Sequence, residues 1–157
     1  MTIKFVLVGC GHIAQRHAYH ICGHANAELI GVCDLDSEKA NKFSNKYGVK
    51  AVASFHDLLN LEADIVVICT PSGLHKTHAL ESFKFNKNVL VEKPMAINYK
   101  DALEMKIAAE NSGKELFVVK QNRYNPPVQR VKLELDNGNF GDIFQVVVNC
   151  FWNRDEN

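Results

Sequence analysis

The stretch IKFVLVGCGHIA, residues 3–14, decides the fold of this chain. Its apolar half has the length of a buried strand and runs straight into the glycines. Glycine accepts positive φ and has no Cβ, so Gly9 suits a tight turn and Gly11 lets the backbone approach a phosphate. Ala14 stands where a third glycine often does, and the N–H groups of the following helix would face the pyrophosphate of a dinucleotide. We expect cofactor contacts from Gly9, Gly11, His12 and Ile13.

Apolar runs and helix-like segments alternate along the first 120 residues. The apolar runs suit parallel strands covered on both faces, and they are residues 3–8, 27–33, 50–53, 65–69, 88–91 and 116–120. Segments of helical length or spacing lie between them, at residues 12–22, 37–46, 55–60, 74–85 and 99–111. Ser37 is the expected N-cap of the second helix, and Gly48 and Gly113 are expected C-terminal glycines. Right-handed crossovers then predict an α/β fold, a Rossmann-type doubly wound parallel sheet of order 3-2-1-4-5-6.

A different pattern follows residue 120. Residues 121–127 form a polar loop ending in two prolines, residues 128–135 suit a helix, and residues 143–152 read as a long strand. A single strand of that length needs a partner, such as the same strand of a second copy. We therefore expect a Rossmann domain over residues 1–122, and the first helix and strand of an incomplete second α+β domain over residues 123–157.

The composition is that of an ordinary globular protein. Eighteen basic and 18 acidic residues give a formal net charge of zero, so there is no footprint for nucleic acid or an anionic membrane. The five cysteines are scattered singly and include no C-x-x-C pair, which is typical of reduced cytosolic thiols. No apolar stretch approaches the length of a membrane span, and no export signal is evident. The expected location is the cytoplasm.

Asp34 follows the second apolar run, 23 residues after Gly11. An acid about 20 residues beyond the glycines accepts hydrogen bonds from the adenosine ribose. Its charge would repel a 2′-phosphate, so NAD is favoured over NADP. The alternative is that Asp34 or Asp36 simply caps the next helix.

Thr70, Pro71 and Ser72 follow the fourth run, with His75 shortly after. The hydroxyls and backbone groups of this segment can contact the cofactor, and His75 is also an expected cofactor contact, although a plain strand exit with a helix cap is the alternative. Histidine pairs with metal-like spacing, His75 with His78 and His20 with His24, lack a carboxylate or cysteine to complete a coordination set. We expect no metal site.

Glu92 and Lys93 follow the fifth run and precede Pro94. A lysine here would project into the crevice, where its charge can stabilise a developing alkoxide during hydride transfer. To act as the proton acceptor itself, Lys93 would need a pKa lowered from about 10.4 toward 7 to 8. The alternative is a solvated surface lysine.

The glycine turn, the segment from Thr70 to His75 and the Glu92-Lys93-Pro94 triplet together resemble the Gfo/Idh/MocA oxidoreductases, over essentially the entire chain. The resemblance implies a Rossmann domain followed by a second domain with an open, mostly antiparallel sheet. It implies that Lys93 is the catalytic lysine beside the nicotinamide and the substrate, with a cis proline after it. Glu92 would help to hold the turn and contact the cofactor or neighbouring backbone.

Residues 120–126 and 151–154 look like the family branch that oxidises UDP-linked N-acetylglucosaminuronic acid at its 3-hydroxyl for bacterial surface polysaccharides. Inositol and other sugar dehydrogenases have related segments. The resemblance implies that Gln121 and Asn122 lie near the nicotinamide, Gln121 as a cofactor contact. It also implies a substrate site that includes Lys93, Asn122, Arg123 and Tyr124.

The family usually places its proton acceptor, a histidine one helical turn from an acid, on the second domain, and that region is absent from this sequence. We therefore expect an NAD-dependent sugar or sugar-nucleotide dehydrogenase whose 157 residues alone are inactive. Family members commonly assemble through the second-domain sheet, which implies a homo-oligomer. The rival interpretation is a non-catalytic dinucleotide-binding module, such as a redox sensor.

Overall fold

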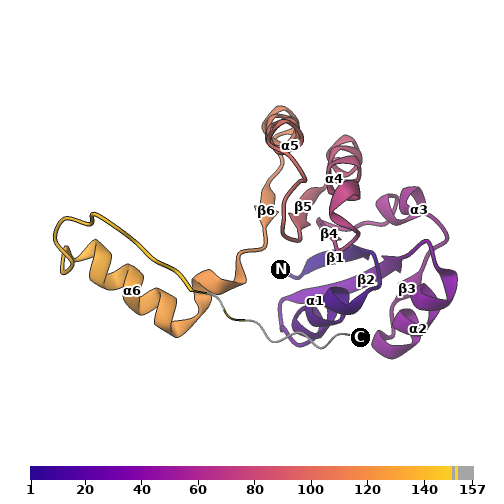
Figure 1. The fold of residues 1–157 in the computed structure, drawn as a ribbon. Coiled ribbons are helices and arrows are strands. Elements are labelled where there is room, and N and C mark those ends of the chain that lie inside the picture. Colours follow the sequence, from indigo (N-terminus) through magenta and orange to yellow (C-terminus); the bar gives the residue numbers. More distant parts are fainter. Residues whose placement is uncertain (150, 152–157) are drawn as a thin grey trace. The chain divides into compact units, whose positions relative to one another are not determined.

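The structure is a computed structural model that describes residues 1–149 and 151. Its sheet has six parallel strands in the order β3-β2-β1-β4-β5-β6 (Figure 1), which confirms the predicted Rossmann-type order. The strands are β1 (Ile3–Val8), β2 (Ala27–Cys33), β3 (Lys50–Ala51), β4 (Ile65–Ile68), β5 (Asn88–Val91) and β6 (Leu116–Val118).

The register aligns the ends of the central strands. Val8 at the end of β1 pairs with Cys33 of β2 on one side and Ile68 of β4 on the other. Ile68 in turn pairs with Val91 of β5. The residues that follow these four strands therefore emerge in one row along the carboxyl edge of the sheet.

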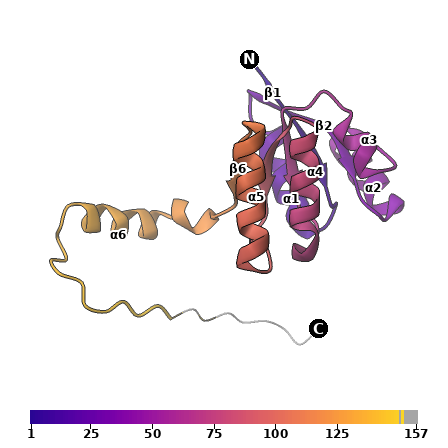
Figure 2. The ribbon, with the colours of Figure 1, turned by 90° about the horizontal axis from the view of Figure 1, so that it is seen from above.

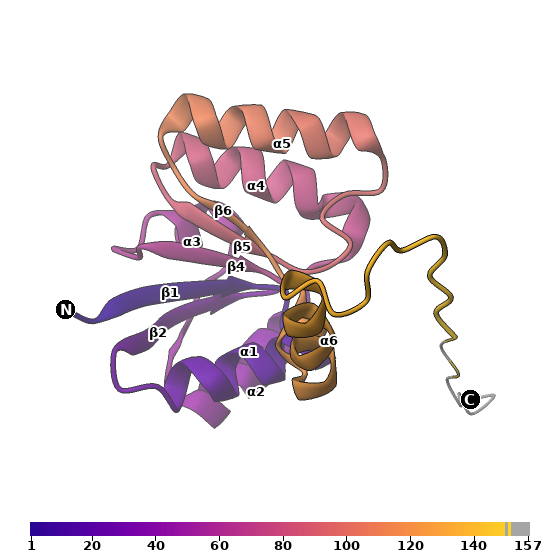
Figure 3. The same cartoon turned by 90° about the vertical axis from the view of Figure 1, so that its left-hand side faces the viewer.

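Helices cover both faces of the sheet. On one face lie α1 (His12–Cys22) and α2 (Ser37–Tyr47), and on the other lie α3 (Phe55–Leu59), α4 (His75–Lys84) and α5 (Tyr99–Ser112). Figure 3 shows α1 and α2 below the sheet with α4 and α5 above it. Figure 2 shows α4 and α5 side by side along their length.

Each face of the sheet has its own apolar core. Leu7, Val32 and Val67 point toward α1 and α2, whereas Val6, Val66 and Val89 point toward α3, α4 and α5. All six side chains are fully buried. Burial on both faces explains why these strands read as continuous apolar runs rather than alternating ones.

Helix ends follow the expected chemistry with one exception. Gly48 and Gly113 end α2 and α5 in the left-handed conformation, as predicted. The prediction that Ser37 is the N-cap of α2 is wrong. The cap is Asp36, whose extended backbone lets its carboxylate accept hydrogen bonds from the N–H groups of Glu38 and Lys39.

The chain divides into two compact units, Met1–Val119 and Lys120–Asn157. The second unit contains the 3₁₀ turn η2 (Gln121–Tyr124) and the helix α6 (Pro126–Asp136). The strand predicted at residues 143–152 is absent from residues 143–149, and Cys150 and Trp152 lie outside the described residues. Val146, Val147 and Val148 are all more than two-thirds exposed. An apolar run has β propensity, but it becomes a strand only when a neighbouring strand pairs its backbone groups.

Candidate cofactor and active site

Four predicted segments meet at the carboxyl edge of the sheet. Gly9 follows β1, Asp34 follows β2, Thr70 lies just beyond β4, and Glu92 follows β5. The crossover after β1 runs over one face of the sheet and that after β4 over the other. In doubly wound sheets the crevice at such a switch point is where ligands bind.

The first two glycines serve different purposes. Gly9 is buried with a φ of +91°, and a Cβ on it would lie 2.8 Å from the carbonyl carbon and oxygen of Cys69. Its N–H donates to the Cys33 carbonyl at 2.8 Å, so it lies wedged between the ends of β2 and β4. A Cβ on Gly11 would meet nothing within 4 Å, so there is open space at the start of α1. The tight turn therefore needs Gly9, whereas Gly11 leaves room for a ligand.

The N-terminus of α1 is suited to an anion. Gly11 is its N-cap and offers no side chain to the first N–H groups, whereas α2, α3 and α5 are capped by the side chains of Asp36, Ser54 and Asn98. Ala14 is fully buried against the sheet, as its small size predicts. Uncapped N–H groups and the helix dipole together fit a pyrophosphate. His12 and Ile13 begin the helix and are exposed.

Asp34 is held in a fixed orientation beside the glycine turn. Its Oδ2 accepts a hydrogen bond from the Cys10 N–H at 2.6 Å, and its Oδ1 accepts one from the Asp36 N–H at 2.9 Å. Each carboxylate oxygen keeps a further lone pair for a ribose hydroxyl. The helix-capping role falls to Asp36, which leaves Asp34 available for the cofactor.

Three cysteines line the same region as small apolar groups. Cys10, Cys33 and Cys69 are buried, whereas Cys22 is exposed and Cys150 lies outside the described residues. Burial, then the nearby Asp34 carboxylate and Cys33, raise the pKa of the Cys10 thiol to about 12. Burial and then Glu92 raise the pKa of Cys69. These thiols stay neutral near pH 7 and therefore are not nucleophiles.

The segment after β4 is tied together by histidines. It begins with Thr70 and the exposed Pro71 and continues into the 3₁₀ turn η1 (Ser72–Leu74). The Thr70 hydroxyl lies 3.1 Å from His78 Nδ1, and burial followed by the neighbouring His75 lowers the pKa of His78. Thr70 and Ser72 are half-buried near the carboxyl edge of the sheet, where cofactor contacts are expected.

The ring of His75 is turned into the protein. It is only 1% exposed, with Nδ1 2.9 Å from the Pro94 carbonyl oxygen and Nε2 2.8 Å from the Thr70 carbonyl oxygen. Both ring nitrogens therefore face backbone, and neither is left for a cofactor. A sequence motif alone places His75 near the crevice but does not reveal that its ring turns inward.

Lys93 lies on the turn after β5. Its side chain is exposed, and within residues 1–149 and 151 its ammonium pairs with no carboxylate. The Lys93–Pro94 peptide bond is cis, which confirms what the resemblance implies. An exposed, unpaired cation at the carboxyl edge is available to a bound molecule.

Glu92 is buried beneath Lys93, with 7% of its surface exposed. Its Oε1 lies 2.8 Å from His17 Nε2, and its Oε2 accepts the Lys93 N–H at 3.0 Å. No sequence motif pointed to a role for His17, which lies 75 positions from Glu92. The available signal was indirect: a buried carboxylate requires a donor, and a histidine on α1 can reach the crevice.

The sequence of the whole Rossmann unit matches one family model. Residues 3–120 match the model described as the GFO_IDH_MocA oxidoreductase family with an NAD-binding Rossmann fold. The chain belongs to the Gfo/Idh/MocA oxidoreductase family. Its sheet and glycine turn are thus those of the family's NAD-binding domain.

Relatives in this family include proteins of known structure. The WlbA dehydrogenase of Chromobacterium violaceum, solved with NADH and UDP-GlcNAcA, is 44% identical with a TM-score of 0.87, covering 89% of this chain and 41% of that one. The WlbA dehydrogenase of Bordetella pertussis, solved with the same two molecules, is 39% identical with a TM-score of 0.87, covering 90% and 44%. Glucose-6-phosphate 3-dehydrogenase of Bacillus subtilis is 33% identical, covering 92% of this chain and 41% of that protein. The chain therefore spans about two-fifths of the length of these Gfo/Idh/MocA relatives.

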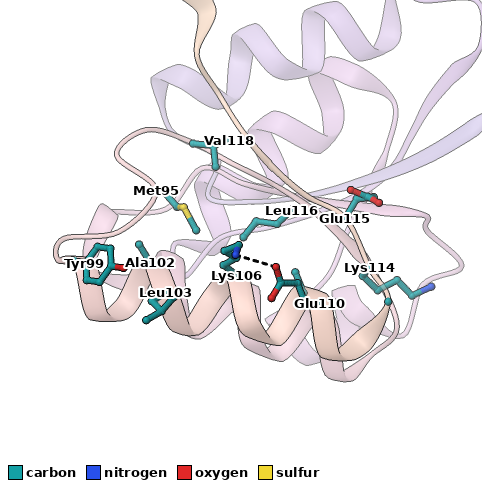
Figure 4. A pocket seen from close by; sticks show the side chains of 12 residues that line it. Met95, Tyr99, Ala102, Leu103, Lys106, Glu110, Lys114, Glu115, Leu116 and Val118 are labelled. Carbon is teal, nitrogen blue, oxygen red and sulfur yellow. Dashed lines mark ion pairs between the residues drawn. The ribbon is translucent and has the colours of Figure 1, made fainter.

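One groove of the first unit lies away from the predicted site residues. A groove lies between α5 and β6 (Figure 4), and the ion pair of Lys106 and Glu110 at 3.1 Å runs along its α5 wall. Its lining comes from α5, β6 and neighbouring loop residues and includes no predicted site residue, so it is separate from the cofactor crevice.

None of the helices in the described part of the chain is both long and apolar enough to cross a membrane.

The expected cofactor contact Gln121 and the expected substrate residues other than Lys93 belong to the second unit. Gln121, Asn122, Arg123 and Tyr124 form η2 and are all exposed. The structure describes that unit by itself, so their roles remain predictions from the resemblance.

Proposed function

We propose that this chain is the cofactor-binding part of an NAD-dependent dehydrogenase that oxidises a hydroxyl of a sugar nucleotide to a ketone. The proposed substrate is of the UDP-GlcNAcA type, because two WlbA dehydrogenases solved with that molecule are 44% and 39% identical to this chain. The observation that carries the proposal is the exposed Lys93 ammonium on the turn after β5, which pairs with no carboxylate among the residues that the structure describes.

Different residues of the Rossmann unit would bind different parts of NAD. The open space at Gly11 and the uncapped N–H groups of α1 fit the pyrophosphate. Asp34, fixed by two backbone N–H groups, would accept hydrogen bonds from the ribose hydroxyls and repel a 2′-phosphate. Thr70, Pro71 and Ser72 would line the same crevice. When bound, NAD supplies the acceptor for the hydride of the substrate carbon.

Lys93 would act on the substrate oxygen. As the hydroxyl proton leaves, negative charge develops on that oxygen, and a nearby ammonium stabilises it most effectively where water is excluded. Because Lys93 serves as the cation in this proposal, a different group must accept the proton. We place that acceptor on a second domain, since the chain spans about two-fifths of its relatives.

Substitution of Lys93 by Ala tests the catalytic proposal. In the full-length protein, Lys93→Ala should lower kcat by about 100-fold or more, the scale of losing one electrostatic stabiliser of the transition state. The affinity for NADH should stay within about twofold, because the pyrophosphate and ribose contacts lie elsewhere. Unchanged turnover would instead favour a non-catalytic dinucleotide-binding module.

The 157-residue chain itself gives a second test. It should bind NADH, seen as a change in NADH fluorescence, and oxidise UDP-GlcNAcA slowly or not at all. Robust turnover by these residues alone would contradict the placement of the proton acceptor on a second domain. Glucose 6-phosphate and inositol, offered to the full-length protein in parallel, would test the choice of substrate.

A further inference from the structure

The turn that carries Lys93 is held from both faces of the sheet. His17 approaches it from α1, which packs on one face, and His75 approaches it from α4, which packs on the other. Their partners, Glu92 and Pro94, flank Lys93 in the sequence. Lys93 is thus the residue between two anchored neighbours.

On the α1 side the link runs through a carboxylate. The side chains of His17 and Glu92 are 16% and 8% exposed, so their contact at 2.8 Å is largely shielded from water. The other oxygen of Glu92 accepts the Lys93 backbone N–H at 3.0 Å. A carboxylate buried this far requires donors on both oxygens, and these two groups supply them. His17 therefore acts on Lys93 through Glu92.

On the α4 side the link runs through a backbone carbonyl. His75 spans from the Thr70 carbonyl oxygen to the Pro94 carbonyl oxygen, at 2.8 and 2.9 Å. Its ring lies between the segment after β4 and the turn after β5, and a proton on Nδ1 lets it donate to the Pro94 carbonyl oxygen. Pro94 has no N–H, so this carbonyl is its one backbone hydrogen-bonding group.

We propose that His17 and His75 are positioning residues that fix the backbone of Lys93, from which its ammonium extends, by holding the Glu92–Pro94 turn from opposite faces of the sheet. The effect of this anchoring on turnover rests on the proposed function of Lys93. Neither histidine is a catalytic residue in this arrangement, because His17 Nε2 is engaged by Glu92 and both nitrogens of His75 face carbonyls.

Hydrogen exchange at the Lys93 amide measures the anchoring directly. In the ¹⁵N-labelled chain, His17→Leu leaves Glu92 without its side-chain donor and should speed exchange of the Lys93 N–H about tenfold or more. The Glu92 N–H, which donates to the Ile68 carbonyl at 3.1 Å, is the internal reference and should keep its rate. His17→Gln retains a donor and should restore most of the protection. The same selective acceleration is expected for His75→Leu.

Two matched controls lie on the same helices. His20→Leu on α1 and Ser82→Ala on α4 change a histidine and a buried hydroxyl that do not contact the turn. Both should leave the Lys93 exchange rate unchanged. Equal rates in the unchanged chain and His17→Leu would overturn the proposal, and so would acceleration of the Glu92 and Lys93 amides together, since that is general destabilisation.

The unchanged chain offers a test that does not depend on the folding of any variant. Long-range ¹H–¹⁵N spectra report which ring nitrogens carry protons. The proposal requires a proton on His17 Nε2, facing Glu92, and one on His75 Nδ1, facing Pro94. An unprotonated nitrogen at either position would remove the corresponding hydrogen bond and overturn the proposal.

Kinetics of the full-length protein connect the anchoring with turnover. His17→Leu and His75→Leu should lower kcat about tenfold to 100-fold with the KM for NAD within about twofold, as displacement of a catalytic group does. His17→Gln should recover most of kcat. If Lys93→Ala leaves turnover intact, the proposed function fails, while the Lys93 exchange rates still decide whether the histidines hold the turn.

Discussion

Gly9 and Gly11 belong to one motif, but the backbone requires glycine only at the first. Gly9 has a φ of +91°, and any Cβ would lie 2.8 Å from the Cys69 carbonyl group. Gly11 has ordinary φ and open space in front of it. The same residue type is thus used once for the turn and once for access by a ligand.

Substitution by Ala should separate these two roles. Gly9→Ala should lower the free energy of unfolding by about 2–4 kcal/mol, because it combines backbone strain with overpacking. Gly11→Ala should leave that free energy within about 1 kcal/mol and weaken NADH binding instead. Urea unfolding and NADH fluorescence titration on both variants measure the two effects. Equal losses of stability would contradict the distinction.

Asp34 and Asp36 are neighbouring acids with separate roles. Asp34→Ser removes the charge that faces the ribose and should weaken NADH binding by about 10- to 100-fold, the scale of losing hydrogen bonds to a charged acceptor. The affinity for NADPH should fall less, because the repulsion between the Asp34 carboxylate and the 2′-phosphate disappears as well. Asp36→Asn is the matched control, since Asn still caps α2 and the preference for NADH should persist. A ratio of affinities unchanged in Asp34→Ser would remove Asp34 from the ribose site.

At the scale of elements, the sequence predicted what local chemistry determines. The strands β1, β2 and β4 are short apolar runs bounded by glycine, Asp and Pro, and neighbouring segments have helical spacing, so their order and type follow from the chain itself. The N-cap of α2 was misplaced by one residue, because Ser37 and Asp36 are both good caps and only the backbone geometry decides between them. The prediction of a strand over residues 143–149 was wrong for a different reason, because a strand needs a neighbouring strand to pair with and β propensity does not provide one.

The contact between α4 and α5 includes two ion pairs. Lys76 of α4 binds Asp101 of α5 at 2.5 Å and Glu104 at 3.1 Å. The hydrogen bond from Lys76 lowers the pKa of Asp101, and the hydrogen bonds to Asp101 and then Glu104 raise the pKa of Lys76. The stability from Asp101 is present above its ordinary pKa and is lost as pH falls through the lowered value. The stability from Lys76 is present below its ordinary pKa and is lost as pH rises through the raised value.

Lys76→Met should therefore destabilise the protein at neutral pH, and the difference from the unchanged chain should close in acid. The closure should occur below about pH 4, the ordinary range of a carboxyl pKa. Lys42→Met is the control, because Lys42 and Glu38 form an exposed pair at 3.8 Å. Thermal unfolding across pH 2–8 measures both variants. A difference that persists undiminished at pH 2 would mean that packing by the lysine stem, rather than charge, joins α4 to α5.

At the scale of the molecule, contacts between distant segments were the part that the sequence could not provide. The crevice was located because strand ends converge in any doubly wound sheet. The links of His17 to Glu92 and of His75 to Pro94 join separate elements, and a histidine on a helix has no local signature of such a partner. Sequence thus predicted which segments meet at the site, whereas the side chains that hold them in place required the structure.

The two units should also differ in what they contribute to stability. Both apolar cores and the whole sheet lie within Met1–Val119, whereas α6 has no buried residue, with Val131 and Leu133 about half exposed. Because hydrophobic stabilisation scales with the apolar surface removed from water, removal of α6 should lower the free energy of unfolding only slightly.

A chain of residues 1–122 should therefore have a free energy of unfolding within about 1 kcal/mol of that of the 157-residue chain and bind NADH within about twofold. Urea unfolding with and without NADH compares the two lengths. A larger loss of stability would contradict this expectation, and an equal stability with weaker NADH binding would show that residues 123–157 contribute to NADH binding.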